Sequence, residues 1–489
     1  MTAPDSIRDA TSSLAVDTIA AISTPPGRGG IGIVRLSGPL AASIAAQLVR
    51  LRQPLEHGRT RLADVLDAPD ASADFAPDAD RIDEALVTYF AAPHSYTAED
   101  LVEIAAHGSP VVLDLLVRRS LSLGARLAEP GEFTQRAFLS GRLDLTQAEA
   151  VRDLIEAQTL TQARQAAGQL GGSLSRRVQP VKQDLVELIA LLEAGIDFAE
   201  DDVEITPEAE IARRIEKLTP PLQALEASFA RGRIIHDGLS LAIVGRPNVG
   251  KSSLFNRLVE RDRAIVTATP GTTRDTVTER IALGGIPLEL VDTAGLRKDQ
   301  GKDSGDGLDE AEQLGILRSR EALADAALAL IVLDATQPLN DEERSLLAAL
   351  QGRPALIVLN KSDLDQSDQS MEVHLASMQA NDSFAAIPAL RTSALTGEGI
   401  QELRERILAL ATGGAASESG MLTSLRHHQA VSSALAALSD AALANSTSIP
   451  HEMILLDLYR ALWALDSLTG QTTPDDILNL IFSTFCIGK

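Results

Sequence analysis

The chain has 489 residues, with 44 Lys or Arg against 68 Asp or Glu, and a formal net charge of −24. This charge argues against holding nucleic acid by general electrostatic attraction, and the 3% of aromatic residues argues against an RNA-binding platform of stacked rings. The single cysteine, Cys486, excludes an internal disulfide framework and a cysteine-rich zinc site. Because neither a bilayer-spanning apolar run nor a signal-peptide core is visible, we expect a soluble cytoplasmic protein with no membrane partner.

The first region predicts an α+β fold. Strand-like residues 19–24 and 31–38 flank the turn sequence PPGRGG, and residues 84–90 and 99–109 predict two further strands after a loop rich in Ala, Asp and Pro at 67–83. Residues 111–124 then have helical spacing. The segment GRGGIG fits G-x-G-x-x-G, but a strand rather than a helix follows it, which argues against a dinucleotide-binding turn.

The second region changes to helical periodicity. From residue 132 to about residue 229, apolar residues three and four apart predict long helices. Breaks between these helices are expected at Gly171-Gly172, Pro180 and Pro220-Pro221.

The third region, from Leu239, alternates apolar strands with helical runs, which predicts an α/β domain with a mainly parallel sheet. The pattern ends near Thr412, where residues 412–420 have the composition of a linker. Amphipathic helices return after this linker, most clearly over residues 455–470. The α/β domain is therefore expected to interrupt a helical domain.

A phosphate-binding motif begins the α/β region. Residues 245–252, GRPNVGKS, match G-x-x-x-x-G-K-[ST] and lie between an apolar strand and a helical run, as this motif requires. The glycines let main-chain N–H groups surround the β-phosphate, Lys251 reaches the β- and γ-phosphates, and the Ser252 hydroxyl is a ligand of Mg²⁺. The predicted phosphate-binding residues are Asn248, Val249, Gly250, Lys251, Ser252 and Ser253.

A second motif selects guanine over adenine. NKSD at residues 360–363 ends an apolar strand, and the Asp363 carboxylate accepts from the ring N–H and the amino group of guanine, whereas adenine leaves it unpaired. Asn360 is expected to fix this loop. After the next strand, the segment at 393–395 is expected to offer a main-chain N–H to the guanine carbonyl. The predicted base site therefore contains Asn360, Lys361, Asp363, Ser393, Ala394 and Leu395.

The sequence between these motifs predicts a magnesium site and a switch. DTAG at 292–295 ends another strand, so that Asp292 approaches Mg²⁺ through water and the Gly295 N–H senses the γ-phosphate. The Thr-rich residues 267–275 predict a switch loop that supplies Thr273 to Mg²⁺. Leu296 follows DTAG where Ras-like proteins have a catalytic glutamine, so another group must activate water. The remaining predicted GTP-binding residues are Thr267, Thr272, Thr273, Asp292, Thr293, Ala294 and Gly295.

Taken together, these sequences resemble the MnmE (TrmE) family of tRNA-modification GTPases over nearly the whole chain. The most specific segments are residues 25–38, 130–151, 271–275, 292–297 and 485–489. The resemblance implies a multidomain α/β protein with an N-terminal α+β folate-binding-like domain, an α-helical domain and an inserted Ras-like P-loop GTPase domain. The expected boundaries are 1–135 for the dimerising, tetrahydrofolate-binding N-terminal domain, 136–232 and 413–489 for the two helical parts, and 233–412 for the GTPase domain.

The resemblance also implies how GTP is hydrolysed. A K⁺ ion stands in for an arginine finger, and the residues that match its ligands are Asn248, Thr267, Thr269 and Thr272. Glu312 matches the catalytic glutamate that orients the attacking water, although residues 299–307 look like an insertion before it. From the residues alone, an exposed helix carboxylate is the preferred interpretation of Glu312, and a loop-bracing hydrogen bond is an equal one for Asn248.

In the N-terminal domain the resemblance implies a site for 5-formyltetrahydrofolate at Arg35, Glu103, Arg142 and Lys489. Arginine pairs with folate carboxylates, and a glutamate accepts from the N–H groups of the pterin. Arg142 stands where the family usually has lysine, which keeps the charge but changes the geometry. Cys486 matches a catalytic position in the CIGK tail, although a lone cysteine is more often an apolar filler.

We therefore expect a K⁺-dependent GTPase that forms a homodimer and works with the FAD-dependent protein GidA (MnmG) in a heterotetramer or larger complex. Together they would place an aminomethyl or carboxymethylaminomethyl group on C5 of the wobble uridine of certain tRNAs, with the tRNA held mainly by the partner. The alternative is a regulatory GTPase switch whose N-terminal domain only dimerises. A ribosome-assembly GTPase of the Era type would need a basic RNA-binding segment, which the sequence does not supply.

Overall fold

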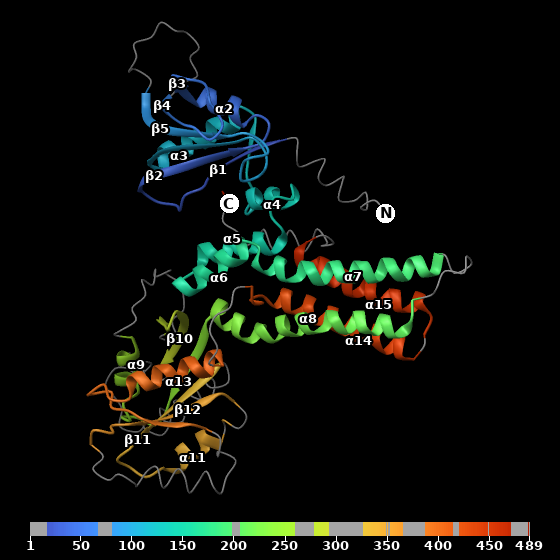
Figure 1. Cartoon of the computed structure of the whole chain (residues 1–489). Coiled ribbons are helices and arrows are strands. Elements are labelled where there is room, and N and C mark those ends of the chain that lie inside the picture. The colour runs from blue at the N-terminus through green and yellow to red at the C-terminus, as the bar shows by residue number, and fades with distance from the viewer. Residues whose placement is uncertain are drawn as a thin grey trace, which may run out of the picture. The chain divides into compact units, whose positions relative to one another are not determined.

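A computed structural model of the chain describes residues 17–66, 81–197, 206–259, 278–292, 326–348, 350, 353–364, 387–413, 420–447, 449–470 and 488. The chain divides into two compact units, whose elements are labelled in Figure 1. The first unit comprises Met1–Arg152, Gln169–Arg176 and Tyr459–Lys489, and the second comprises Asp153–Gly168 and Arg177–Leu458. None of the helices in these described ranges is long and apolar enough to cross a membrane.

The first unit contains a seven-stranded sheet with the order β3-β4-β5-β6-β2-β1-β7. Neighbouring strands are antiparallel except for β1 and β7, which run parallel. The strands are β1 (Thr18–Ile22), β2 (Gly29–Ser37), β3 (Val49–Leu51), β4 (Thr60–Leu66), β5 (Arg81–Phe90), β6 (Leu101–Gly108) and β7 (Ala125–Leu127). Helices α2 (Ala41–Leu48) and α3 (Pro110–Ser122) cover one face and share a buried core with alternate strand residues.

Two helices follow the sheet in the first unit. Helix α4 (Glu132–Leu139) begins after Gly131 and buries Phe133 against β1, and helix α5 (Leu145–Glu156) packs on α4 through a small apolar cluster. At the other end of the chain, Gly488 lies against Ile22 and Ser23 at the end of β1. The N-terminal sheet and the C-terminal segment therefore meet in one unit.

The remaining helices lie wholly or partly in the second unit. Helices α8 (Glu208–Asp237) and α14 (Leu425–Ser446) lie wholly in this unit, and α14 packs along α8. Helices α6 (Leu160–Leu170), α7 (Ser173–Asp197) and α15 (His451–Thr469) contribute residues to both units. The expected break at Gly171-Gly172 is confirmed, because α6 ends before it and α7 begins after it.

The expected breaks at the prolines are wrong. Pro180 lies inside α7, and Pro220-Pro221 lies inside α8. A proline removes one main-chain N–H and therefore one helical hydrogen bond. Around Pro220-Pro221 the buried side chains of Leu218 and Leu222 hold α8 in its packed position, so tertiary contacts outweigh the lost hydrogen bonds.

The second unit also contains the predicted α/β domain. Its six-stranded sheet has the order β13-β12-β11-β8-β10-β9, and every neighbouring pair is parallel except β10 with β9. The strands are β8 (Leu239–Val244), β9 (Thr278–Leu283), β10 (Ile286–Asp292), β11 (Leu328–Asp334), β12 (Ala355–Asn360) and β13 (Ala389–Arg391). Helices α9 (Lys251–Val259) and α13 (Ile400–Thr412) cover one face, and α11 (Asp341–Ala348) covers the other.

The sequence therefore predicts the fold class correctly but misses its smallest elements. Strands β3 and β7 have three residues each, too few to show alternation, and the Ala-rich helix α2 and strand β4 were not expected. Residues 81–83 belong to β5 rather than to the predicted loop, because pairing with β4 extends that strand. The residue boundaries of the domains stay a prediction, with the change from helix α8 to strand β8 falling at Gly238.

Candidate functional site

The phosphate-binding loop connects β8 to α9 at the carboxyl edge of the parallel sheet. Gly245 has φ +152° and Gly250 has φ +98°, values that L side chains rarely adopt. A Cβ at Gly245 would overlap the Val332 carbonyl, and a Cβ at Gly250 would overlap the Asn360 side chain. Both glycines of the motif are therefore needed for the close approach of the loop to β11 and β12.

Lys251 lies inside this loop. Its ammonium donates to the carbonyl oxygens of Gly245 at 2.6 Å and of Arg246 at 2.8 Å, and the side chain is buried. These bonds hold the positive charge within the turn of N–H groups, where the motif places the β- and γ-phosphates. Ser252 and Ser253 follow on the first turn of α9 and are exposed.

Asn360 joins the phosphate loop to the predicted base loop. Its amide nitrogen donates to the Val249 carbonyl at 2.8 Å, and its amide oxygen accepts from the Ala394 N–H at 3.0 Å. The residue is buried at the end of β12, so neither bond competes strongly with water. One side chain thus fixes two loops that the sequence places far apart.

Lys361 and Asp363 follow on the same loop. Lys361 has φ +65°, and its ammonium donates to Asp334 Oδ2 at 2.7 Å. Burial raises the pKa of Asp334, but hydrogen bonds from Lys361 and Thr336 outweigh that effect, and the pKa of Asp334 lies below its usual value. Asp334 therefore holds Lys361 as an ion pair, while Asp363 is exposed at the same edge.

Arg257 on α9 supports the other side of the base loop. Its guanidinium donates to the carbonyl oxygens of Ala394 at 2.9 Å and of Leu395 at 2.6 Å, and Ser393 donates its N–H to Glu398. Sequence reasoning missed Arg257 and Asp334, because neither lies in a motif. The sequence indicates them only by position, because Arg257 lies on the helix after the phosphate loop and Asp334 lies at the end of a strand.

Other predicted residues are placed only in part or lie outside the described residues. The main chain of Asp292 ends β10 and pairs in register with Ile243 of β8, which brings it to the edge that carries the phosphate loop. The predicted residues outside the described ranges are Thr267, Thr269, Thr272, Thr273, Thr293, Ala294, Gly295, Glu312, Cys486 and Lys489.

A second polar site lies in the first unit, on the sheet face opposite α2 and α3. Arg35 of β2 and Glu103 of β6 are register partners, and Arg35 donates from Nε and Nη2 to Glu103 Oε1 at 3.0 and 2.7 Å. Arg35 Nη1 also donates to the Gly488 carbonyl at 3.3 Å, and the Ser23 hydroxyl donates to the same oxygen at 2.9 Å. The C-terminal segment is thereby brought to the Arg35–Glu103 pair.

Two aromatic rings complete this site. The Arg35 guanidinium lies 5.4 Å from the Tyr96 ring centre and 5.5 Å from that of Phe133, distances suited to cation–π attraction. Arg142 lies over the same Tyr96 ring at 5.2 Å and donates to the Tyr96 carbonyl at 2.9 Å. Three of the residues predicted for folate, Arg35, Glu103 and Arg142, thus share one neighbourhood, and Tyr96 and Phe133 were not predicted.

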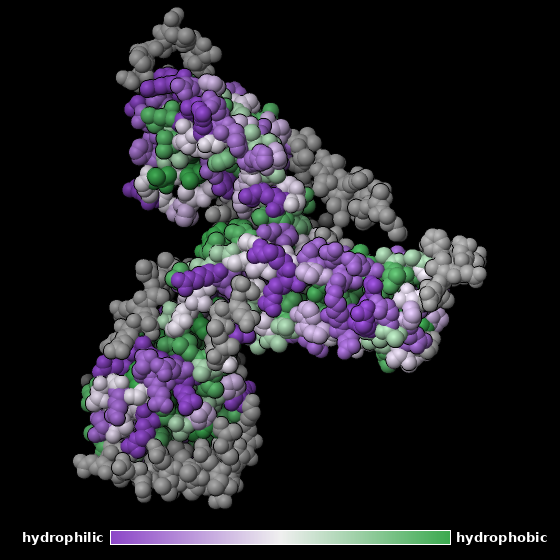
Figure 2. Space-filling view, viewed as in Figure 1, coloured by the Kyte–Doolittle hydropathy of each residue, from purple (hydrophilic) through white to green (hydrophobic). Residues whose placement is uncertain are grey.

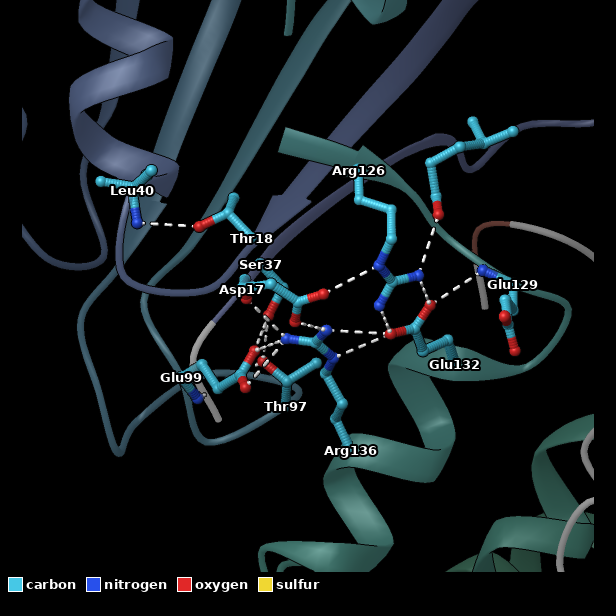
Figure 3. A network of polar contacts seen from close by, with 11 residues as sticks. Asp17, Thr18, Ser37, Leu40, Thr97, Glu99, Arg126, Glu129, Glu132 and Arg136 are labelled. Carbon is cyan, nitrogen blue, oxygen red and sulfur yellow. Dashed lines mark hydrogen bonds and ion pairs between the residues drawn. The ribbon is translucent and has the colours of Figure 1, made fainter. Parts of the chain in front are cut away.

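A network of charges fixes α4, which carries Phe133, against this sheet (Figure 3). Arg136 donates to Glu132 Oε1 at 2.9 Å, to Asp17 Oδ1 at 2.7 Å and to Glu99 at 3.1 Å. Arg126 donates to the same Glu132 Oε1 at 2.6 Å and to Glu132 Oε2 at 3.0 Å. Arg136 and Glu132 are both buried, so the network satisfies charges that would otherwise be costly inside the protein.

The network shifts the protonation of its members. Burial raises the pKa of Glu132, but hydrogen bonds from Arg126, from the Glu129 N–H and from Arg136 outweigh it, and the pKa lies below its usual value. The pKa of Arg126 is raised, first by its hydrogen bond to Glu132. Glu132 and Arg126 are therefore both charged at neutral pH.

The fold and the nucleotide site define a multidomain α/β protein with a P-loop GTPase domain inserted into a helical domain. Two family models match the chain: "GTP-binding protein TrmE N-terminus" over residues 18–142 and "MnmE helical domain" over residues 145–486. The chain belongs to the MnmE (TrmE) family of tRNA-modification GTPases, and it is a GTPase that acts in tRNA modification.

Relatives of known name match along the whole chain. The tRNA modification GTPase MnmE of Koribacter versatilis is 57% identical over 478 residues, which cover 97% of this chain and 99% of the relative. Proteins of the same name from Natranaerobius thermophilus and Moorella thermoacetica are 39% and 41% identical, each over 97% of this chain and 99% of the relative. The solved structure of Era in complex with MgGDPNP and 16S ribosomal RNA is 23% identical and covers 41% of this chain and 66% of that chain, with a TM-score of 0.28.

Proposed function

We propose that the chain is a K⁺-dependent GTPase that modifies C5 of the wobble uridine of certain tRNAs with a one-carbon unit from tetrahydrofolate. The main support for this proposal is that Arg35 donates hydrogen bonds both to Glu103 and to the Gly488 carbonyl in the first unit. This arrangement brings Gly488 of the CIGK tail to a paired cation and carboxylate in the first unit, whereas the nucleotide loops belong to the second unit. Such a site suits a small ligand that has both carboxylates and a hydrogen-bonding ring.

The residues around Arg35 fit a tetrahydrofolate. Arg35 and Arg142 can pair with carboxylates of the ligand, and Glu103 can accept from the N–H groups of its pterin ring. The half-buried Tyr96 ring, which both guanidinium groups approach, adds an apolar surface to the site. Bound there, the cofactor would supply the one-carbon unit, while the chain's residues bind and orient it. Lys489 and the catalytic role of Cys486 remain part of the proposal.

The metal ions belong to the nucleotide site. Two residues are proposed as Mg²⁺ ligands. Ser252 is exposed at the start of α9, and Thr273 lies outside the described residues. Asn248 is exposed and has φ +66°, a conformation that Asn tolerates better than most residues, and its amide oxygen suits K⁺. The cations would neutralise charge that develops on the phosphates, with Thr267, Thr269 and Thr272 as further K⁺ ligands and Glu312 orienting water.

A homodimer is proposed through the open face of the N-terminal sheet. Leu62, Leu86, Ala105 and Ile33 are successive register partners across β4, β5, β6 and β2, and they form an apolar row beside Arg35 and Glu103. Leu62 and Leu86 are 50% and 49% exposed. On the side seen in Figure 2, the domain that carries this sheet presents apolar patches between hydrophilic residues. An apolar row beside an ion pair is typical of a surface that a second copy covers.

The remaining partners are proposed from chemistry and charge. With a net charge of −24, the chain is unsuited to hold tRNA by itself, so the FAD-dependent protein GidA (MnmG) would bind most of the tRNA in a heterotetramer or larger complex. GTP hydrolysis would then drive closing and reopening of the assembly rather than supply atoms to the product.

The proposed tetrahydrofolate site is tested by titrating the full chain with 5-formyltetrahydrofolate. Saturable binding is expected, and Arg35→Met should weaken it by about tenfold or more, because a charge-assisted pair is lost. Arg118→Met is the matched control, since Arg118 lies on α3, which covers the other face, and pairs only with Asp114 in the described residues. If the wild-type chain shows no saturable binding, the regulatory-switch alternative is favoured.

The proposed K⁺ dependence is tested by measuring the GTPase rate in K⁺ and in Na⁺ buffers of matched ionic strength. A higher rate in K⁺ is expected, and Asn248→Ala should remove the difference while Asn256→Ala, an exposed asparagine on α9, should keep it. Equal rates in both salts would contradict the K⁺ site and leave the folate proposal to its own test.

A further inference from the structure

A buried ion pair ties the phosphate loop to helix α11. Arg246, the second residue of the loop, places Nε 3.1 Å from Glu343 Oε1. The Glu343 side chain is 1% exposed and that of Arg246 is 17% exposed. A carboxylate removed from water to this extent requires a charged partner, and Arg246 is the partner that the structure provides from the nucleotide site.

Glu343 is itself held from the opposite side. Asn340 precedes α11, and its N–H donates to Glu343 Oε2 at 3.0 Å, while Glu343 returns its own N–H to Asn340 Oδ1 at 2.8 Å. This reciprocal pair is a capping box, which fixes the carboxylate at the start of the helix. Helix α11 is anchored in the core through Leu346 and Leu347. The carboxylate that meets Arg246 therefore has a fixed position.

Arg246 passes this constraint to the nucleotide site through its own main chain. The Arg246 carbonyl accepts the hydrogen bond from Lys251, so one residue binds Glu343 with its side chain and Lys251 with its main chain. A change in the side-chain position of Arg246 moves the peptide that holds the Lys251 ammonium. The same peptide leads into Pro247 and Asn248, where the loop turns with a positive φ at Asn248.

We propose that Glu343 is a positioning residue for nucleotide binding. Through Arg246 it fixes the half of the phosphate loop that orients Lys251 and Asn248, although Glu343 itself does not touch the nucleotide. Because this part of the loop surrounds the β-phosphate, which GDP and GTP share, the pair affects the affinity for both nucleotides, and through Lys251 it also affects the contact with the γ-phosphate of GTP. A residue that acts through the switch segments would instead change GTP binding alone.

The test measures affinity for GDP and for a non-hydrolysable GTP analogue with the full chain. Glu343→Gln keeps an oxygen for the Asn340 N–H but removes the charge that holds Arg246. We expect the affinity for GDP to be about tenfold weaker and the affinity for the GTP analogue to be weakened at least as much. Asn340→Ala is the matched control: it opens the capping box but keeps the ion pair, so it should lower the melting temperature and leave both affinities within about twofold.

Three further variants distinguish positioning from general destabilisation. If Glu343 acts through Arg246, then Arg246→Met and the double variant Arg246→Met/Glu343→Gln should bind GDP equally, because the second change removes nothing more. Arg246→Lys, which keeps a cation opposite Glu343, should bind more tightly than Arg246→Met. Wild-type affinity in Glu343→Gln, additive losses in the double variant, or an equal loss of affinity in Asn340→Ala would each overturn the proposal.

Discussion

The side-chain amide of Asn360 donates to the main-chain carbonyl of Val249 at 2.8 Å, across 111 residues of sequence. The same side chain accepts from the Ala394 N–H, so a single residue determines the spacing between the loop for the phosphates and the loop for the base. Nucleotide affinity depends on this spacing, because both ends of one ligand must fit at once.

Asn360→Ala should therefore weaken GDP binding by more than about tenfold and lower the free energy of unfolding by about 3 kcal/mol, since two buried groups lose their partner. Titration of GDP and urea unfolding measure the two effects. Asn256→Ala on α9 is the control, because that side chain is exposed. An Asn360→Ala chain that binds GDP like the wild type would show that the two loops hold their spacing without this bridge.

How far the sequence predicts this site depends on how each residue acts. Asn360, Lys251 and Asp363 belong to motifs whose order along the chain indicates their positions, since parallel strands bring their carboxyl ends to one edge. Arg257, Glu343 and Asp334 could not be found in this way. Each acts through a tertiary contact with a motif residue, and an Arg on a helix or an Asp at a strand end is common everywhere.

The N-terminal site shows the same limit. The resemblance to a family indicates Arg35, Glu103 and Arg142, but the contact of both arginines with the Tyr96 ring depends on how the loop before β6 folds, which the sequence does not show. The helices through Pro180 and Pro220-Pro221 are the opposite case. There the rule that proline breaks a helix fails, because burial of the surrounding apolar residues stabilises each helix more than the missing hydrogen bonds destabilise it.

Arg257 offers a prediction that is specific to the base loop. Arg257→Met should leave the phosphate loop intact but release the carbonyl groups of Ala394 and Leu395, so the loop at 393–395 loses its fixed position. We expect GDP to bind about three- to tenfold more weakly, while inorganic pyrophosphate, which lacks the base, competes as well as before. Arg353→Met is the control, because Arg353 precedes β12 at the opposite end of that strand. Equal losses for GDP and pyrophosphate would place the effect in the phosphate loop instead.

Glu132 offers a prediction about acid stability. Its folded-state pKa lies below the usual value, so it contributes stability above the unfolded pKa, and this contribution is lost as the pH falls through the folded value. Glu132→Gln should lower the free energy of unfolding at pH 7 by about 2–3 kcal/mol, because buried Arg136 loses a partner while Arg126 can turn to water. The variant should also lose less stability than the wild type between pH 5 and 3. Urea unfolding of both chains at each pH measures this, and parallel curves would exclude Glu132 as the titrating group.

His236 gives the corresponding prediction on the alkaline side. It is the residue before the last of α8, and its Nε2 lies 3.1 Å from Asp153 Oδ1 while its Nδ1 lies 2.7 Å from Asp237 Oδ1. The hydrogen bond with Asp153, opposed by burial and assisted by Asp237, raises the pKa of His236 to about 9. A histidine raised in this way contributes stability that is complete below its unfolded pKa and is lost as the pH rises through the folded value.

The wild-type second unit should therefore lose stability between about pH 6.5 and 9, by at most about 3 kcal/mol and by less where solvent screens the pair. His236→Gln should remove this dependence of stability on pH. Asp153→Asn should shift the loss of stability to lower pH, because the histidine then keeps only Asp237 as a charged partner. Thermal unfolding across this pH range measures the slope, and proton NMR of the imidazole measures the pKa itself. His428, which stacks on Phe229 in the same unit, gives the control variant His428→Gln, whose slope should match the wild type. If His236 titrates near 6.5, the ion pair with Asp153 does not form in solution.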